Sequence, residues 1–432
     1  MGRPILFIDI AALLKQELTP TRAVRLALRD ALLNRAIPYL FGWDACLADN
    51  ATPRTLLQQL SQHPDFLFVA SNKRWQAHAV DNGRTLLWLD FPIPSFRQRR
   101  QLWNHLMGPA AAEFSIDKLA GQFALTTEQI RDVVITARDK GVQHGRELED
   151  EDLFAAARAH SNPRLGDLAR KITPRYTWDD LVLPRDPVNI LREIVDTVLR
   201  RPIVLDEWGI GQKLASGGVT VLFAGPPGTG KTMAAEVIAR ELGLDLYKID
   251  LSGVVSKYIG ETEKNLERIF NEAQSSNAIL FFDEADSIFG KRSEVKDAHD
   301  RYANIEVSYL LQRMEAYDGV TILATNLRAN LDEAFTRRLQ FAVDMPFPEA
   351  EDRLRIWRTL FPPDLPHDDD LDFMLLAKRF KLAGGNIRNV IVSAAYLAAG
   401  NGHKVTMEHL LHGTRRELQK MGRLVDKDDL KV

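Results

Sequence analysis

The stretch Gly225-Pro226-Pro227-Gly228-Thr229-Gly230-Lys231-Thr232, followed by Met233, decides how this sequence is interpreted. It fits the pattern G-x-x-x-x-G-K-[ST], in which glycines let successive backbone N–H groups point inward and cradle a polyphosphate at a helix N-terminus. Lys231 is placed to reach the β- and γ-phosphates, and Thr232 offers a hydroxyl group to Mg²⁺. We therefore predict that residues 225–233 bind a nucleoside triphosphate together with Mg²⁺.

The sequence on both sides of this loop alternates short apolar strands with amphipathic helices. Residues 219–224 form an apolar run typical of a buried parallel strand, and residues 233–242 place apolar side chains along one helical face. Further strands are expected over 244–251, 278–282 and 320–325, and a further helix over 261–273. Such alternation predicts a parallel sheet with helices on both faces. After Pro348 only helical periodicity continues, which predicts a helical lid.

Polar side chains follow two of these predicted strands. Asp283 and Glu284 end one strand, where one carboxylate can hold Mg²⁺ and its neighbour can polarise an attacking water. Asn326 ends another strand, where its amide can orient the same water. Arg337 and Arg338 follow shortly after, and arginine neutralises transition-state charge in phosphoryl transfer, sometimes from a neighbouring subunit. Downstream of a phosphate-binding loop, these residues predict phosphoryl-transfer chemistry.

The chain also contains an internal repeat. Asn72 and Asn326 occupy matching positions in two similar segments 254 residues apart, and Trp103 and Trp357 keep the same spacing. After a small insertion the similarity continues at a spacing of 257. A constant register over several segments predicts two related copies in tandem.

The first copy lacks a phosphate-binding loop. The alignment of its opening strand places Asp9 opposite Asp283 and Ile10 opposite Glu284. Without the loop and the glutamate, we expect the first copy not to hydrolyse ATP. It is either a degenerate remnant or the downstream part of a longer tandem protein, and the sequence does not decide between the two.

Together these motifs resemble those of the AAA+ ATPases, specifically the AAA branch of protein-remodelling hexamers. The resemblance rests on GPPGTGKT (225–232), ILFFDEAD (279–286), LATN (323–326) and the paired arginines of LDEAFTRRL (331–339). It implies a P-loop NTPase fold: an α/β parallel sheet with a C-terminal helical lid, preceded by a partial, degenerate AAA-like module. The expected parts are that module over 1–171, a linker and adenine-side segment over 172–200, the large ATPase domain over 201–347 and the lid over 348–432.

The resemblance also implies roles for single residues around the nucleotide. These are adenine-side contacts from Asp180 and Leu181, a first sensor at Asn326, and arginine fingers at Arg337 and Arg338 that act on a neighbouring subunit. Arg388 lies where many AAA+ proteins carry a second sensor, which implies a contact with the γ-phosphate. Arg131 repeats this arginine in the first copy, so a packing role for Arg388 is an equal alternative.

The segment SKYIGETEKNL (256–266) resembles the first pore loop of the AAA branch. The resemblance implies that Lys257, Tyr258 and Ile259 project into the central channel of a ring. An aromatic side chain there grips extended polypeptide of any sequence through apolar contact. The alternative is that Tyr258 packs against its own domain.

Composition limits the classes of function. The 432 residues carry 56 Lys and Arg against 59 Asp and Glu, a formal charge of −3, so no global basic field favours nucleic acid or an anionic membrane. The single cysteine, Cys46, excludes an intramolecular disulfide framework and fits a reducing compartment. No run of about 18 uncharged apolar residues occurs. We therefore expect a cytoplasmic protein that contacts no membrane.

We interpret the sequence as an ATP-hydrolysing, Mg²⁺-dependent motor that remodels or threads polypeptide through the pore of a homo-oligomeric, hexameric ring. Two alternatives stay open: a nucleic-acid-directed loader or motor on the same fold, against which the net acidity stands, and a nucleotide-gated assembly scaffold. The sequence of the second copy most resembles bacterial AAA proteins with a degenerate first module, some of which accompany contractile injection systems. The sequence does not identify the polypeptide substrate.

Overall fold

A computed structural model describes the chain over residues 3–48, 51–73, 75, 85–161, 169–213, 218–251, 261–274, 278–285, 308–326, 337–400 and 404–423. The chain divides into two compact units, the amino-terminal unit Met1–Phe91 and the carboxy-terminal unit Pro92–Val432. Within the described residues, no helix has both the length and the apolar character needed to cross a membrane.

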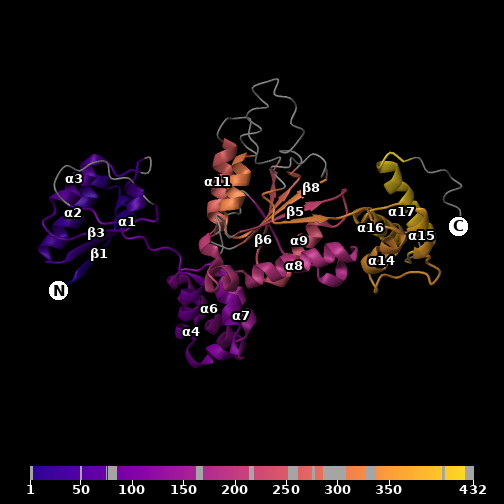
Figure 1. The fold of residues 1–432 in the computed structure, drawn as a ribbon, viewed down its shortest axis with the longest axis horizontal. Coiled ribbons are helices and arrows are strands. Elements are labelled where there is room, and N and C mark those ends of the chain that lie inside the picture. The colour runs from indigo at the N-terminus through magenta and orange to yellow at the C-terminus, as the bar shows by residue number, and fades with distance from the viewer. Residues whose placement is uncertain are drawn as a thin grey trace, which may run out of the picture. The chain divides into compact units, whose positions relative to one another are not determined.

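The amino-terminal unit is a three-stranded parallel sheet with helices on one face (Figure 1). Its strands, in spatial order, are β1 (Ile5–Asp9), β2 (Ile37–Phe41) and β3 (Phe68–Val69). Its helices are α1 (Ile10–Leu14), α2 (Pro20–Leu33), the 3-10 turn η1 (Trp43–Cys46) and α3 (Arg54–Gln62). Apolar side chains of these helices pack with Leu40 and Val69 of the sheet. The core of this unit therefore lies on one side of the sheet.

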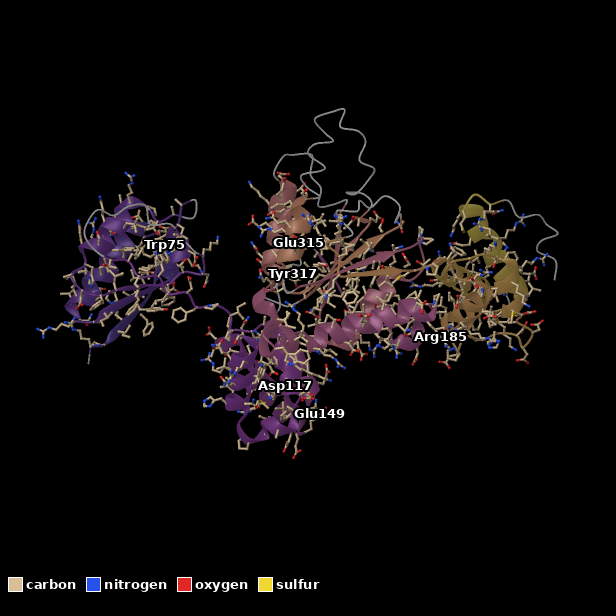
Figure 2. All side chains as sticks on the ribbon, in the orientation of Figure 1. Trp75, Asp117, Glu149, Arg185, Glu315 and Tyr317 are labelled. Atoms are coloured by element: carbon tan, nitrogen blue, oxygen red, sulfur yellow. The ribbon has the colours of Figure 1, made fainter. Side chains whose placement is uncertain are left out.

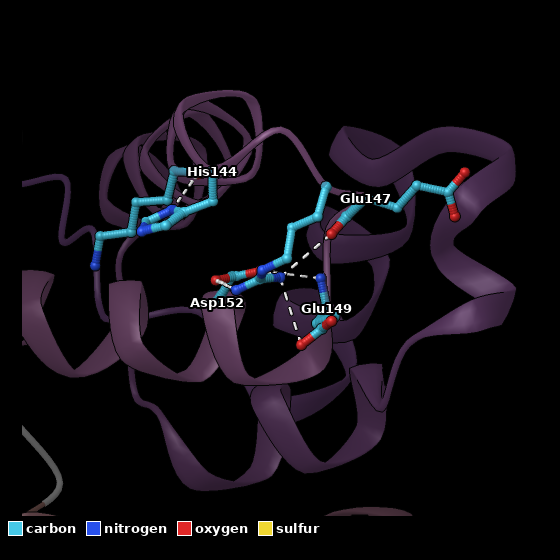
Figure 3. A network of polar contacts seen from close by, with 6 residues as sticks. His144, Glu147, Glu149 and Asp152 are labelled. Carbon is cyan, nitrogen blue, oxygen red and sulfur yellow. Dashed lines mark hydrogen bonds and ion pairs between the residues drawn. The ribbon is translucent and has the colours of Figure 1, made fainter.

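Four helices open the carboxy-terminal unit and pack around a core of their own. They are α4 (Phe96–Met107), α5 (Ile116–Gln122), α6 (Thr127–His144) and α7 (Asp150–His160), with the 3-10 turn η2 (Gly108–Glu113) after α4. The turn into α7 is fixed by Arg146, which donates to both carboxylate oxygens of Asp152 at 2.8 and 3.0 Å (Figure 3). This ion pair holds the pKa of Asp152 below its ordinary value. These helices are called the first helical domain below.

A six-stranded sheet forms the body of the carboxy-terminal unit. Its order is β4-β6-β7-β8-β5-β9, with an antiparallel edge strand β4 (Arg170–Ile172) and five parallel strands. The parallel strands are β5 (Val219–Ala224), β6 (Leu246–Asp250), β7 (Ile279–Asp283), β8 (Val320–Thr325) and β9 (Phe341–Asp344). Helices α8 (Arg185–Pro202) and α9 (Lys231–Leu242) pack on one face. Helix α11 (Glu261–Gln274) and the helical residues 308–316 pack on the other.

The predicted α/β architecture is confirmed, because the parallel sheet is covered on both faces. Every residue of β5 and of β8 is buried, and both strands have the bounds expected from the sequence, 219–224 and 320–325. Tyr317, labelled in Figure 2, donates from its hydroxyl to the carbonyl of Ala278 at 2.6 Å and so joins the helix over 308–316 to the start of β7. Burial raises the pKa of this phenol.

A second four-helix domain, called the lid below, follows the sheet. It consists of α14 (Ala350–Leu360), α15 (Phe373–Arg379), α16 (Gly384–Gly400) and α17 (Met407–Lys420) around a separate core. The helices succeed each other in the same order as α4 to α7, at the repeat spacings found in the sequence. The lid therefore repeats the architecture of the first helical domain.

An arginine makes the same contacts in both helical domains, buried in one and partly buried in the other. Arg353 of α14 donates from Nε to Ala377 O at 2.8 Å and from Nη1 to Pro348 O at 2.6 Å. Arg99 of α4 makes the corresponding pair of contacts at 2.9 and 2.5 Å. Burial lowers the pKa of Arg353, yet a guanidinium stays charged at neutral pH and must have its donors satisfied. The shared solution marks the two domains as structural copies.

The sheets of the two units also correspond, as their strand registers show. Tyr39 of β2 lies opposite Phe68 of β3, and Phe281 of β7 lies opposite Ile322 of β8. Phe68 and Ile322 are 254 residues apart, which is the spacing of the repeat. Strand β2 is therefore the counterpart of β7, and its other neighbour β1 is the counterpart of β6. Helices α2 and α11, which follow β1 and β6, each contain 14 residues.

The predicted match of Asp9 and Ile10 with the acidic pair at the end of β7 is therefore wrong. Phe41 and Gly42 take those two positions, because they follow β2 in the register in which the acidic pair follows β7. The error has a simple cause: β1, β6 and β7 are all short apolar strands that end in aspartate. Only the order of the strands distinguishes them. The first copy thus lacks both carboxylates of this pair, whereas the alignment of the sequence predicted that it lacks only the glutamate.

Candidate nucleotide-binding site

The loop that carries the phosphate-binding motif lies between β5 and α9. Gly228 and Gly230 have φ angles of 78° and 102°, in the left-handed region that glycine adopts without strain. Gly230 is also the N-cap of α9, so the loop leads directly into a helix N-terminus. Backbone N–H groups and the positive end of the helix dipole are therefore available to an anion at this loop.

Lys231 is buried in the first turn of α9, where oxygen atoms surround its ammonium group. Its Nζ donates to Gly225 O at 2.7 Å, to Pro226 O at 3.1 Å and to Asn326 Oδ1 at 2.9 Å. The last contact joins the loop to the end of β8. Lys231 and Asn326, which the sequence assigned to one site, therefore touch each other.

Asp283 and Glu284 lie at the end of β7. Asp283 Oδ2 pairs with Lys248 Nζ of β6 at 2.6 Å, and the backbone N–H of Glu284 donates to Asp283 Oδ1 at 3.0 Å. Glu284 has a φ of 55°, a left-handed conformation that costs a non-glycine residue about 1–2 kcal/mol. The sequence analysis missed Lys248, although one lysine within the apolar strand LYKID was an available signal.

The adenine-side segment places its two predicted residues in different settings. Thr177 donates from its backbone N and from Oγ1 to Asp180 Oδ2, at 2.7 and 2.9 Å, so the carboxylate closes the 3-10 turn η4 (Trp178–Asp180). Leu181 is buried, and its side chain lies beside Gly230 of the loop. The geometry therefore offers Leu181 as the apolar contact for a base, while the side chain of Asp180 fixes the turn.

Helix α9 holds this segment through polar contacts that the sequence did not predict. Arg175 donates from its backbone N to Glu236 Oε2 at 3.1 Å and accepts at its carbonyl from Arg240 Nη1 at 3.0 Å. Trp178 Nε1 donates to Glu241 Oε2 at 3.1 Å. Because α9 also begins at the phosphate-binding loop, one helix sets the distance between that loop and the adenine side.

A cavity of about 640 Å³ brings these groups together. The predicted residues that line it are Asp180, Leu181, Pro227, Gly228, Thr229, Gly230, Lys231, Thr232, Met233, Asp283, Glu284, Asn326 and Arg388. The predicted residues that do not line it are Gly225, Pro226, Arg337 and Arg338. The volume lies within the range of about 300–1,000 Å³ that is usual for cofactor pockets. The cavity also includes Tyr176 and Glu236, which the sequence analysis did not single out.

The lid contacts the phosphate-binding loop through the first turn of α16. The backbone N–H of Gly385 donates to Gly228 O at 3.1 Å. Asn386 and Asn389 both donate to Glu417 Oε1, at 3.1 and 3.0 Å, which ties α16 to α17. Arg388, between the two asparagines, lines the cavity. Of the two alternatives for Arg388, this geometry favours a role at the nucleotide.

The paired arginines lie away from the cavity of their own chain. Arg338 Nε pairs with Glu315 Oε1 at 3.1 Å, and both arginines precede β9. Lys231 and Arg388 line the cavity, whereas Arg337 and Arg338 do not. The predicted pore residues Lys257, Tyr258 and Ile259 lie outside the described residues.

Comparison with protein families gives two matches. Residues 221–348, which include the phosphate-binding loop and the ends of β7 and β8, match the model of the ATPase family associated with various cellular activities (AAA). Residues 95–163, which include the first helical domain, match the model of the contractile injection system ATPase helical domain.

The chain is also similar to curated AAA proteins. It is 30% identical over 248 residues to the proteasome-activating nucleotidase of Saccharolobus islandicus, which covers 55% of this chain and 62% of that protein. It is 32% identical over 267 residues to 26S proteasome subunit RPT4 of Saccharomyces cerevisiae, with 60% of each chain covered. An uncharacterized AAA family ATPase of Sinorhizobium fredii is 35% identical over 186 residues, 43% of this chain and 54% of that protein.

The chain thus spans between about half and two thirds of the length of these relatives. The family match covers residues 221–348, which contain the phosphate-binding loop, the ends of β7 and β8, and Asn326. The chain therefore carries an AAA ATPase domain over residues 221–348, preceded by a segment similar to the helical domain of contractile injection system ATPases.

Proposed function

We propose that this protein hydrolyses ATP and uses the energy to remodel or thread polypeptide. The observation that carries the proposal is the cavity itself. It unites a phosphate-binding loop, an acidic strand end, an asparagine on the neighbouring strand and an arginine of the lid. Each of these groups has a use in phosphoryl transfer, and they derive from segments far apart in the sequence.

The phosphates of ATP bind at the loop, where backbone N–H groups and Lys231 meet them. Lys231 then exchanges its contacts with Gly225 O and Pro226 O for phosphate oxygens. The donor set also fits Mg²⁺, which prefers hard oxygen ligands, because the hydroxyl of Thr232 and the carboxylate of Asp283 line the same cavity. When bound, this ion neutralises charge on the β- and γ-phosphate oxygens.

Glu284 acts as the general base and Asn326 orients the attacking water. Two observations support these roles: Glu284 lines the cavity, and Asn326 accepts a hydrogen bond from Lys231 of the loop. The test is phosphate release from ATP by the full chain, compared with Glu284→Gln. General acid–base catalysis contributes about 10²- to 10⁴-fold, so turnover falls by that factor while ATP stays bound.

Retention of full turnover in Glu284→Gln would refute the assignment. Phosphate release by the unmodified chain that depends on Glu284 also excludes the scaffold alternative, since a scaffold binds nucleotide without turnover. Salt-sensitive DNA binding that stimulates turnover would instead support the nucleic-acid alternative.

Arg337 and Arg338 complete the site of a neighbouring subunit in a homo-hexameric ring. Their position outside their own cavity supports this assignment. Arg337→Ala is expected to leave ATP affinity nearly unchanged and to lower turnover by about 10³-fold or more. Mixing Arg337→Ala subunits with Lys231→Ala subunits restores part of the turnover, because each supplies what the other lacks. Absence of any recovery in mixed rings would contradict an action between subunits.

Lys257, Tyr258 and Ile259 grip the polypeptide in the central pore. Tyr258→Ala is then expected to hydrolyse ATP while failing to unfold a tagged model protein, and Tyr258→Phe retains unfolding. If Tyr258→Ala unfolds the model protein normally, the pore assignment is wrong, while the ATPase assignment is unaffected.

We further propose that the protein serves a contractile injection system in the cytoplasm. The match of residues 95–163 supports this context, and the one cysteine, buried at Cys46, suits a reducing compartment. The Glu284→Gln variant holds ATP without turnover, so it is expected to retain its polypeptide partner during purification. Identification of that partner by mass spectrometry tests the assignment, and a partner unrelated to injection machinery would overturn it.

A further inference from the structure

Both oxygen atoms of the Asp283 carboxylate are engaged by groups of its own domain. Oδ2 accepts from Lys248 Nζ at 2.6 Å, and Oδ1 accepts from the backbone N–H of Glu284 at 3.0 Å. The contact with Lys248 is a charge-assisted hydrogen bond, a class roughly twice as strong as the bond between neutral groups. The carboxylate is therefore held in one orientation, with its charge balanced by a lysine.

Lys248 reaches Asp283 from the neighbouring strand and does not line the cavity. In the register of the sheet, Lys248 of β6 lies opposite Phe281 of β7, two residues before Asp283 and on the same face. Asp283 lines the cavity, whereas Lys248 does not. The two side chains are 34% and 23% exposed, so the pair can open without leaving either charge buried. Lys248 can therefore influence a ligand in the cavity through Asp283.

The first copy lacks both members of this ion pair. Strand β1 is the counterpart of β6, and Phe7 stands at the position of Lys248. Strand β2 is the counterpart of β7, and Phe41 stands at the position of Asp283. The lysine thus occurs in the copy that has the carboxylate and is absent from the copy that does not. This pattern links Lys248 to Asp283 rather than to the construction of the sheet.

The cavity as a whole is acidic, which makes the charge at Asp283 important. Its lining includes the cationic side chains of Lys231 and Arg388 and five carboxylates, those of Asp180, Glu236, Asp283, Glu284 and Asp352. An excess of negative charge attracts cations. The pair of Asp283 with Lys248 is the only ion pair that one of these carboxylates makes with a described residue. Lys248 therefore neutralises the carboxylate that is assigned to the metal.

We propose that Lys248 is a positioning residue for Asp283, which makes this carboxylate a ligand for a divalent cation only when nucleotide is present. The role rests on the proposed function, in which Asp283 holds Mg²⁺. In the nucleotide-free chain, Lys248 orients the carboxylate and cancels its charge, so a free cation gains little by binding there. The negative phosphates of ATP outweigh one lysine, and Asp283 then accepts the cation together with them.

The set of possible ligands agrees with this dependence on nucleotide. Among the described residues, no group of three or more His, Cys, Asp or Glu side chains could hold a metal ion. A cation at Asp283 therefore needs further oxygen ligands, and Mg²⁺ is usually bound by one or two carboxylates together with substrate phosphates. With few ligands from the protein, one neighbouring positive charge has a large effect on the affinity for a free cation.

The test measures binding of Mn²⁺ to the nucleotide-free full chain, from the loss of the electron paramagnetic resonance signal of the free ion. Lys248→Met is expected to lower the Kd for Mn²⁺ by about tenfold, because it removes a positive charge a few ångströms from a doubly charged ion. Lys248→Arg keeps the charge and should keep the Kd of the unmodified chain. The double variant Lys248→Met/Asp283→Asn should lose the gain, which assigns the gain to Asp283.

Lys171→Met is the matched control. Lys171 pairs with Asp245 Oδ2 at the same distance of 2.6 Å. Asp245 directly precedes β6 and does not line the cavity. The control therefore breaks an ion pair of the same kind at the other end of the same strand. It should leave the Kd for Mn²⁺ unchanged.

An unchanged Kd for Mn²⁺ in Lys248→Met, at the melting temperature of the unmodified chain, would overturn the proposal. A gain of equal size in Lys171→Met, or one that persists in the double variant, would do the same. If Lys248→Met melts at a lower temperature, Lys248→Gln takes its place, since glutamine keeps a donor for Asp283 without the charge. Phosphate release by the unmodified chain is measured separately, so a chain that hydrolyses ATP but shows no gain in either variant refutes the role of Lys248 alone.

Discussion

The residues that directly follow β7 and β2 share a left-handed backbone conformation, but only the residue after β7 carries a carboxylate. Glu284 follows β7 with a φ of 55°, and Gly42 follows β2 with a φ of 69°. At the preceding position, Asp283 is replaced by Phe41. Glycine takes the left-handed conformation without strain, whereas glutamate does not. The second copy therefore has a carboxylate on a strained backbone at this position, and the first copy has an unstrained glycine turn.

The two helical domains, in contrast, have kept the same side chains and contacts. Arg99 and Arg353 keep the same pair of backbone contacts, and Trp103 and Trp357 are both fully buried. Packing within a domain persists because each buried group depends on its neighbours. The acidic pair at the end of β7 makes no such core contacts, and Phe41 and Gly42 take its place in the first copy.

The largest effect is expected from making the strand end of the second copy resemble that of the first. Glu284→Gly removes the carboxylate and is expected to lower turnover by about 10²- to 10⁴-fold. It also relieves the left-handed strain, so the free energy of unfolding rises by about 1 kcal/mol. Phosphate release and chemical denaturation measure the two effects. Glu284→Ala is the matched control, since it loses the activity and keeps the strain; equal stability of the two variants would show that the backbone is not strained.

The next effect concerns which copy binds nucleotide. Lys231→Ala removes a buried cation and is expected to weaken ATP binding by about 100-fold, since hydrogen bonds to charged groups contribute about 1.5–3 kcal/mol. Isothermal titration calorimetry measures the loss. Lys15→Ala, an exposed lysine of the amino-terminal unit, should bind as the unmodified chain does. Tight ATP binding by Lys231→Ala would place a nucleotide in the first copy and contradict the expectation that only the second copy binds it.

The arginines that hold the two helical domains together should have effects of the same kind. Arg353→Met and Arg99→Met each leave two carbonyl acceptors without their donor, at a cost of about 2 kcal/mol where the acceptors are buried. Denaturant unfolding of the full chain, followed by hydrogen exchange in each domain, separates the two losses. Arg358→Met, at an exposed position of α14, serves as the control. A large cost in one domain and none in the other would show that the copies have diverged in packing as well.

The smallest effect is one of pH and compares one carboxylate of each unit. Burial alone would raise the pKa of Glu417, but hydrogen bonds from Asn389, Lys420 and Asn386 outweigh it and hold the pKa below its ordinary value. The same balance, with hydrogen bonds from residues 71–73, lowers the pKa of Asp44 below its ordinary value.

A lowered folded pKa gives stability that is present above the unfolded value and lost as the pH falls through the folded one. Melting temperatures measured from pH 6 down to about 2 should therefore decline first at or below the unfolded values of these groups. Glu417→Gln and Asp44→Asn should flatten this decline in the lid and in the amino-terminal unit respectively. Unchanged acid sensitivity in both variants would assign the decline to other carboxylates.

Local patterns in the sequence predicted the second copy well. The bounds of β5 and β8 follow from uninterrupted apolar runs, and the loop from its glycine spacing. The strand equivalence of the first copy was not predictable in this way, because three apolar strands end alike and only pairing separates them. The contacts of Lys248, Glu236 and Gly385 join residues that are distant in the sequence, and no local period encodes them.

The hydrogen bond from Gly385 to Gly228 has a mechanical consequence. It fastens the first turn of α16 to the loop that receives the phosphates, and α16 contains 17 residues. At 1.5 Å per residue this helix is about 25 Å long, so a tilt of about 5° at its fastened end moves the other end by about 2 Å. The lid is thus attached at the phosphate-binding loop itself, so a small displacement of that loop would be amplified at the far end of α16.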